Sequence, residues 1–191
     1  MKRILAVFIL FSFSSSHSAM TQEPFFPDGF ILSPLMRSTH FVRDIDESVK
    51  LYGAILGLKP RVERTASGKE WDQILGVENK TVRVMILQSG EYVFANVGLF
   101  QFVGEKQPPR PVSRTSVETG DAALVFLTSD IFGINEKVKA AGYAIVSEPI
   151  VLFPKEGSDT QSYEMLFFDL DGILVNLIQR NVPSSQVPSS D

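Results

Sequence analysis

A repeat within the chain is the feature that most restricts its fold. Asp44 is followed by an apolar helical pattern that ends at Gly57, and Asp130 by a similar pattern that ends at Gly142. The aspartates are 86 positions apart and the glycines 85. Aspartate is a preferred helix N-cap, and glycine is a preferred residue just beyond a helix C-terminus. The spacing therefore predicts two copies of one supersecondary unit, each with a capped helix.

Strand-like apolar runs surround each predicted helix. One run precedes each helix, at 37–42 and 123–128, and three follow it, at 58–63, 81–87 and 93–103 in the first copy and at 143–147, 163–168 and 173–179 in the second. This order predicts an α+β fold of two tandem βαβββ modules. We expect each sheet to pack one face on its helix and to turn the other toward the sister module, so that the two modules form a shared cavity.

Segments outside the modules differ in composition. Residues 1–19 carry Lys2 and Arg3, an apolar run too short to span a bilayer, and then small residues, which is the layout of a secretory signal peptide. This predicts a secreted or periplasmic protein that has no membrane contact after signal removal. We interpret 20–32 as a leader segment, 33–180 as one domain with modules at about 33–104 and 121–180 joined by a linker at 105–120, and 181–191 as a disordered tail.

Composition excludes several classes of function. The chain has 22 acidic and 18 basic residues, and this acidic balance argues against a nucleic-acid partner. It has no cysteine, which excludes disulfide scaffolds, thiolate metal sites and cysteine nucleophiles. Of its two histidines, His17 lies in the predicted signal peptide. Only His40 is left, so a site that needs several imidazoles is excluded as well.

Three segments carry a family resemblance. RSTHFVRDIDESVKLYGAILGL at 37–58 is similar to the opening of a module of the vicinal oxygen chelate superfamily, which includes glyoxalase I, extradiol dioxygenases and bleomycin-binding proteins. LVFLTSDIFGINEKVKAAGY at 124–143 resembles the opening of its second module, and FFDLDGILVNLIQR at 167–180 resembles its closing strand. The resemblance implies two modules that face each other around a cavity, and pairing into a homodimer.

Members of this superfamily commonly hold a divalent metal with His and Glu side chains. The resemblance places these ligand positions at Arg37, Ala123 and Asn176, with a fourth near Gly98 or Leu99. None of these residues is a His or a Glu, and an arginine repels a cation. The resemblance therefore implies no metal site, and we expect no other cofactor.

Strand alternation selects the residues that face the predicted cavity. The ligand-binding candidates are Arg37, Thr39, Phe41, Ala123, Val125 and Asn176. A mostly apolar lining with one cation and one amide suits an organic anion or an aromatic compound. Arg37 either pairs with an anionic ligand or forms a salt bridge to an acid such as Glu164. Trp71, the single tryptophan, is either an aromatic wall or lid of the site or a packing residue.

Two other features have a functional and a structural interpretation. His40 alternates with Arg37 and Thr39 and is expected on the opposite face, in a structural role, although a bulge could turn it inward as an acid or base. Asp169 and Asp171 resemble the nucleophile motif of haloacid-dehalogenase-type phosphatases, but too little chain follows them for that fold. A tight hairpin turn is the simpler interpretation.

Two functions remain open at this point. The first is a metal-independent protein that binds a small organic ligand in the inter-module cavity. The alternative is an enzyme of lyase or isomerase type that resembles glyoxalase I, the lactoylglutathione lyase. The sequence identifies no catalytic residue for it.

Overall fold

The computed structural model describes residues 31–104 and 114–188. The chain divides into two units, Met1–Pro34 and Leu35–Asp191, and every helix and strand of the described residues lies in the second. The predicted signal peptide, most of the leader segment and part of the linker lie outside the described residues. Among those that are described, no helix is long and apolar enough to cross a membrane.

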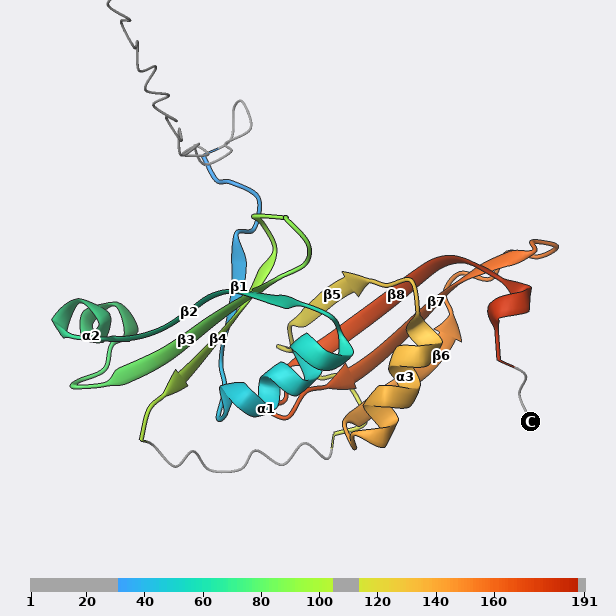
Figure 1. The fold of residues 1–191 in the computed structure, drawn as a ribbon. Helices are drawn as coiled ribbons and strands as arrows, with labels where there is room; N and C mark the ends of the chain where they lie inside the picture. Colours follow the sequence, from blue (N-terminus) through green and yellow to red (C-terminus); the bar gives the residue numbers. More distant parts are fainter. Residues whose placement is uncertain (1–30, 105–113, 189–191) are drawn as a thin grey trace, which may run out of the picture. The chain divides into compact units, whose positions relative to one another are not determined.

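The first module consists of one four-stranded sheet with helices (Figure 1). Its strands have the order β1-β4-β3-β2, with β1 and β4 parallel and the other neighbours antiparallel. Along the chain its elements are β1 (Arg37–Phe41), α1 (Ile45–Val49), the π-helix η1 (Lys50–Ile55), β2 (Lys59–Ser67), α2 (Lys69–Leu75), β3 (Thr81–Gln88) and β4 (Asn96–Phe102).

The second module repeats this topology. Its sheet has the order β5-β8-β7-β6, again with the first strand of the module parallel to the last. The elements are β5 (Ala123–Leu127), α3 (Ile131–Ala140), β6 (Ala144–Val151), β7 (Thr160–Phe168), β8 (Leu174–Pro183) and the short 3-10 helix η2 (Ser184–Gln186). The prediction of two tandem βαβββ modules in an α+β fold is confirmed.

Both predicted helix caps are present. The carboxylate of Asp44 accepts hydrogen bonds from the backbone of the first helical turn, and that of Asp130 accepts one from the backbone N–H of Gly133. Gly57 and Gly142 have φ angles of 81° and 77°, which favour glycine because a Cβ is strained there. The modules differ between the cap and the glycine. In the first module the helix continues after Val49 as a π-helix, whereas α3 does not.

Two segments differ from the expectation. The short helix α2 was not expected between β2 and β3. We expected a disordered tail at 181–191, and this is wrong for its described part. There β8 continues to Pro183, which pairs with Thr160 at the start of β7, and the helix η2 follows. Val182 is 1% exposed, so this strand end is held by burial as well as by pairing.

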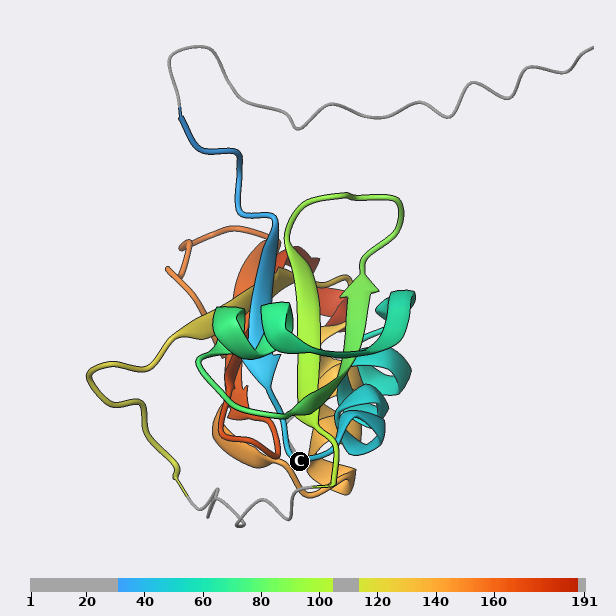
Figure 2. The same ribbon diagram turned by 90° about the vertical axis from the view of Figure 1, so that its left-hand side faces the viewer.

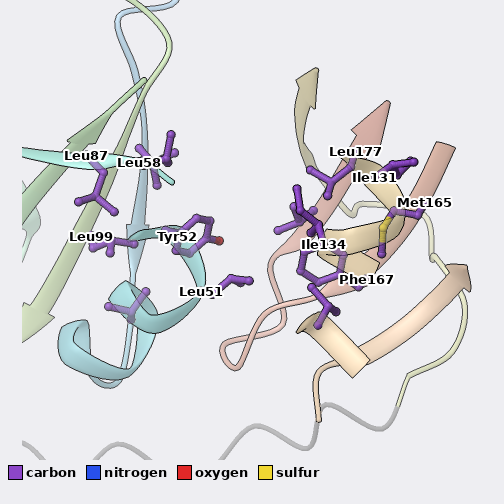
Figure 3. Close-up of a cluster of buried hydrophobic side chains, with 14 of the residues drawn as sticks. Leu51, Tyr52, Leu58, Leu87, Leu99, Ile131, Ile134, Met165, Phe167 and Leu177 are labelled. Atoms are coloured by element: carbon purple, nitrogen blue, oxygen red, sulfur yellow. The ribbon is translucent and has the colours of Figure 1, made fainter. Parts of the chain in front are cut away.

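The hydrophobic core has two clusters: a small one of Val82, Val84 and Phe100 packed against Trp71 of α2, and a larger one on the sides of the two sheets that α1, η1 and α3 cover. The larger cluster joins Leu51 and Tyr52 of η1, strand residues such as Leu99, and Ile134 of α3 with Phe167 of β7 (Figure 3). Figure 3 shows Leu51 on the side of η1 that faces the second module, and α3 packs against η1. Both helices thus bury apolar surface against their own sheet and against each other.

The predicted cavity residues do not lie on the sides of the sheets that form the larger cluster. They occupy the other side of each sheet, where Phe41 is 48% and Val125 59% exposed. We call these sides the open face of the first sheet, with Arg37, Thr39, Phe41 and Phe100, and the open face of the second sheet, with Ala123, Val125, Asn176 and Glu164. No hydrogen bond, ion pair or ring contact of the described residues joins the two open faces.

The expected cavity between the modules is therefore not formed from these faces within one chain. The physical reason is that α1 with η1 and α3 have apolar residues on more than one side, and packing them together covers both. Strand alternation correctly separates the two sides of each sheet, but it carries no information about which side meets the sister module.

Candidate ligand site

Arg37 is held in place on the open face of the first sheet. Its Nε donates a hydrogen bond of 2.8 Å to Oγ1 of Thr39, and its guanidinium carbon lies 5.6 Å from the centre of the Phe100 ring. Gly98 on β4 makes room for this arrangement, because a Cβ there would lie 2.7 Å from Cδ of Arg37. Arg37 forms no ion pair with any residue in the described ranges. The predicted alternative, a salt bridge to Glu164, is not present.

Aromatic rings extend this face beside Arg37. Phe41 meets Phe100 edge-on and stacks on Phe102, each with 5.6 Å between ring centres. Trp71 of α2 lies 6.2 Å from Phe100, and the guanidinium of Arg64 lies over its indole. In Figure 2, α2 lies in front of the strands of this sheet. Trp71 therefore packs on this face, while its role as an aromatic wall or lid of a ligand site stays a prediction.

The open face of the second sheet combines apolar strand residues with two polar side chains. Parallel pairing of β5 with β8 places Ala123 beside Leu174 and Val125 beside Asn176. The Asn176 Nδ2 donates a hydrogen bond of 2.6 Å to Oε1 of Glu164, while its buried Oδ1 has no partner in the described structure. This face therefore offers an apolar surface with one amide and one carboxylate.

The six predicted ligand-binding residues thus form two groups rather than one. Arg37, Thr39 and Phe41 lie together on β1, and Ala123, Val125 and Asn176 lie together on β5 and β8. Their binding role stays a prediction.

The residues at the family's metal-ligand positions do not fit the divalent metal that many members of the family hold. The Arg37 guanidinium is a cation and a donor only, and Ala123 and Gly98 supply no side-chain ligand. The Asn176 amide is already bonded to Glu164. In the described ranges, no group of three or more His, Asp or Glu side chains is placed to hold a metal ion.

His40 lies on the side of β1 opposite to Arg37, as alternation predicts. Its Nε2 is 2.9 Å from Oγ of Ser38, two residues earlier on the same side of the strand. Burial lowers the pKa of His40 below its ordinary value of 6.5, so the imidazole is neutral at pH 7. No bulge turns it toward the open face.

The FDLDG segment forms the predicted hairpin turn. Oδ1 of Asp169 accepts hydrogen bonds from the backbone N–H groups of Asp171 and Ile173, and Gly172 has a φ of 80°. Asp171 in turn accepts from the backbone and side chain of Arg43, which belongs to the first module. The two aspartates are therefore structural residues that connect the modules.

Several residues of the candidate site were missed or not placed by the sequence reasoning. Phe100, which is 5% exposed, and Phe102 make ring contacts with Phe41, and Gly98 shapes the space for Arg37. A signal was available: the alternation in VGLFQF at 97–102 puts these three residues on one side of β4. Arg64 had no such signal, because its contact is to α2, which the sequence did not predict.

Comparisons with known proteins agree with this architecture. Residues 37–177 match the family described as the Glyoxalase/Bleomycin resistance protein/Dioxygenase superfamily. No curated protein is similar enough in sequence to count as a match.

Solved structures show the same fold at low sequence identity. A glyoxalase family protein from Bacillus cereus is 14% identical, with a TM-score of 0.66, over 82% of this chain and 99% of that one. A glyoxylase/bleomycin resistance protein/dioxygenase domain from Frankia is 20% identical, with a TM-score of 0.51, over 78% and 99%. Glyoxalase I from Zea mays is 22% identical, with a TM-score of 0.52, over 78% of this chain and 45% of the maize chain. The chain belongs to the glyoxalase/bleomycin resistance protein/dioxygenase superfamily.

Proposed function

We propose that this protein is an exported, metal-independent binding protein for a small organic anion with an aromatic or apolar body. The observation that carries the proposal is the guanidinium of Arg37, which lies over the ring of Phe100 and forms no ion pair with residues 31–104 or 114–188. Its Nε is used by Thr39, so its two terminal nitrogens remain for the oxygens of a carboxylate. Phe41 and Trp71 would enclose the apolar body.

The single tryptophan provides a direct test of binding. Trp71 borders the proposed site, so a ligand on this face should change its fluorescence. We expect benzoate or cinnamate to produce a saturable change and the neutral benzamide to produce a much smaller one. Arg37→Ala should weaken benzoate binding by about 10 to 100-fold, as expected for a lost charge-assisted pair. The matched control Arg61→Ala removes a cation from the exposed part of β2. Equal affinities in the two variants would overturn the assignment.

The metal-independent part of the proposal rests on the side chains at the family's ligand positions. Arg37, Ala123 and Asn176 supply neither imidazole nor carboxylate there. Elemental analysis of protein purified without chelators tests this point. A stoichiometric amount of zinc, nickel, manganese or iron would contradict it.

We propose further that two copies of the chain complete the site. The open face of the second sheet exposes 59% of Val125 and 66% of Leu127, which is unusual for a strand that faces water. A second copy that places this face against the open face of the first sheet would cover both and would unite the two groups of predicted residues. Sedimentation should show a dimer that Val125→Lys dissociates and that Val117→Lys, an exposed valine elsewhere, leaves intact. A monomeric unmodified chain would refute the pairing.

Export is proposed from the sequence of residues 1–19. Its basic start, short apolar run and small residues support a cleaved signal. N-terminal sequencing of the protein from its native host should find a start near residue 19 or 20. Retention of Met1 would exclude cleavage.

The lyase or isomerase alternative needs an acid and a base at the ligand. His40 lies on the other side of β1, and Glu164 is the carboxylate of the open face of the second sheet. Turnover of a bound carbonyl compound that is lost in Glu164→Gln would favour the enzyme over the binding protein.

A further inference from the structure

A cavity lies on the side of the second sheet that α3 covers, away from the open face of that sheet. It has a volume of about 590 Å³ and is bounded by α3, β6, β7 and the segment that follows η2. Figure 1 shows α3 beside β6 and β7 in this part of the molecule. The volume is within the range of sites that hold small organic molecules, about 300 to 1,000 Å³.

One part of the cavity wall is aromatic and aliphatic. Phe132 of α3 meets Tyr163 of β7 edge-on, with 5.0 Å between the ring centres. Val187, which follows η2, also lines the cavity. These side chains suit an aromatic ring or an alkyl chain, since neither would need a hydrogen-bond partner here.

Another part of the wall is polar and is organised by one buried amide. Asn135 is 4% exposed, and its Nδ2 lies 3.2 Å from Oε1 of Glu136 and 3.3 Å from Oε2 of Glu148. A carboxylate oxygen only accepts, so the amide must turn its NH₂ group to both acids. Its buried Oδ1 is then left without a hydrogen-bond partner among the described residues. All three residues line the cavity, which therefore presents two carboxylates beside a buried amide.

A lysine of the protein already places its ammonium group near these two carboxylates. Nζ of Lys139 lies 3.1 Å from Oε2 of Glu148 and 3.9 Å from Oε1 of Glu136. Its hydrogen bond holds the pKa of Glu148 below the ordinary value, so this carboxylate is ionised at neutral pH. One lysine balances only one of the two acids, and the cavity keeps a net negative charge.

We propose that this cavity binds an amphipathic organic cation, a primary ammonium attached to an aromatic or alkyl body. The ammonium pairs with Glu136 and Glu148, and the apolar body contacts Phe132 and Tyr163. A primary ammonium has three N–H donors, so it can pair with both carboxylates at once. The site is independent of the proposed function, because it uses the other side of the second sheet and none of the residues around Arg37.

Titration calorimetry with 2-phenylethylammonium tests the proposal. We expect saturable binding to the purified chain and much weaker binding of the uncharged 2-phenylethanol and the anionic 3-phenylpropanoate. Glu136→Gln and Glu148→Gln should each weaken binding of the ammonium compound by about tenfold, which is the effect of one lost charged contact. Glu91→Gln, an exposed acid of the first module, is the matched control and should have no effect.

A third variant tests whether binding needs the space in the cavity as well as the charge of the two glutamates. Val187→Trp should fill the apolar part and abolish binding while both carboxylates remain, with an unchanged thermal unfolding midpoint as the check on folding. Three results would overturn the proposal: no binding of the ammonium compound at millimolar concentration, equal binding of the alcohol, or wild-type affinity in both glutamine variants.

Discussion

The hydroxyl of Tyr52 in the first module donates a hydrogen bond of 2.9 Å to Oδ2 of Asp169 in the second, 117 positions further along the chain. Both groups are buried. The other oxygen of Asp169 accepts the two backbone N–H groups of its hairpin turn. A single carboxylate therefore shapes the turn and holds η1 against it.

Removing the Tyr52 hydroxyl should destabilise the protein. Tyr52→Phe leaves one oxygen of Asp169 buried without its donor, which costs about 1 to 3 kcal/mol of unfolding free energy. Tyr92→Phe removes the same atom from a side chain that is 75% exposed, and it should have little effect. Urea denaturation of both variants measures the difference, and similar midpoints would contradict the role assigned to this bond.

Asp169 should also make stability depend on pH. Burial raises the pKa of Asp169 above its ordinary value of 3.8, so the folded chain binds this proton more readily than the unfolded chain. Its contribution favours folding in acid and is lost as the pH rises through the folded pKa. The stability of Asp169→Asn relative to the unmodified chain should therefore increase as the pH rises from below 3.8 through the folded pKa of Asp169. Urea midpoints across this range test it, and a constant difference would argue against the raised pKa.

His40 should titrate in the opposite sense. Its pKa is lowered by burial, so the folded chain binds this proton less readily than the unfolded chain, and stability should fall as the pH drops below 6.5. In a His17→Gln variant His40 is the single histidine, and one imidazole resonance reports it by NMR. We expect a midpoint below 6.5 in the folded state and near 6.5 in urea. A folded midpoint at or above the value in urea would show that burial does not control this group.

Gly98 should matter for binding more than for folding. A Cβ there would lie 2.7 Å from Cδ of Arg37 and 3.2 Å from Oγ1 of Thr39, so Gly98→Ala must displace the arginine side chain. The atoms that must move belong to side chains and not to the backbone, which keeps the cost in stability small. Benzoate affinity, measured through Trp71 fluorescence, should fall while the thermal midpoint changes little. A large loss of stability with unchanged affinity would contradict this account.

Much of the fold could be predicted from local chemistry. Asp44 and Asp130 cap helices, and Gly57 and Gly142 end them, because these positions depend on a few neighbouring backbone groups. The end of β8 could not be predicted in this way. NVPSSQVPSSD at 181–191 is polar and rich in proline, and only pairing with the start of β7 and burial of Val182 order its first part.

The sequence predicted which residues of one strand lie together in the candidate site, but not how the two modules are arranged around it. Alternation along β1 places Arg37, Thr39 and Phe41 together, and the hydrogen bond from Arg37 to Thr39 follows from that spacing. The position of the sister module depends instead on how η1 packs against α3, a long-range contact that leaves no local signal. Trp71 was noticed, but its place beside Phe100 depends on the unexpected helix α2.

The cluster that joins Leu51 to Ile134 and Phe167 has a consequence for how the molecule comes apart. Each module supplies part of the cover for the apolar side of the other, so neither has a complete interior of its own. Loss of one half exposes the other half to water, which makes partial opening costly. The duplicated chain should therefore melt in one cooperative transition, as a single thermodynamic unit.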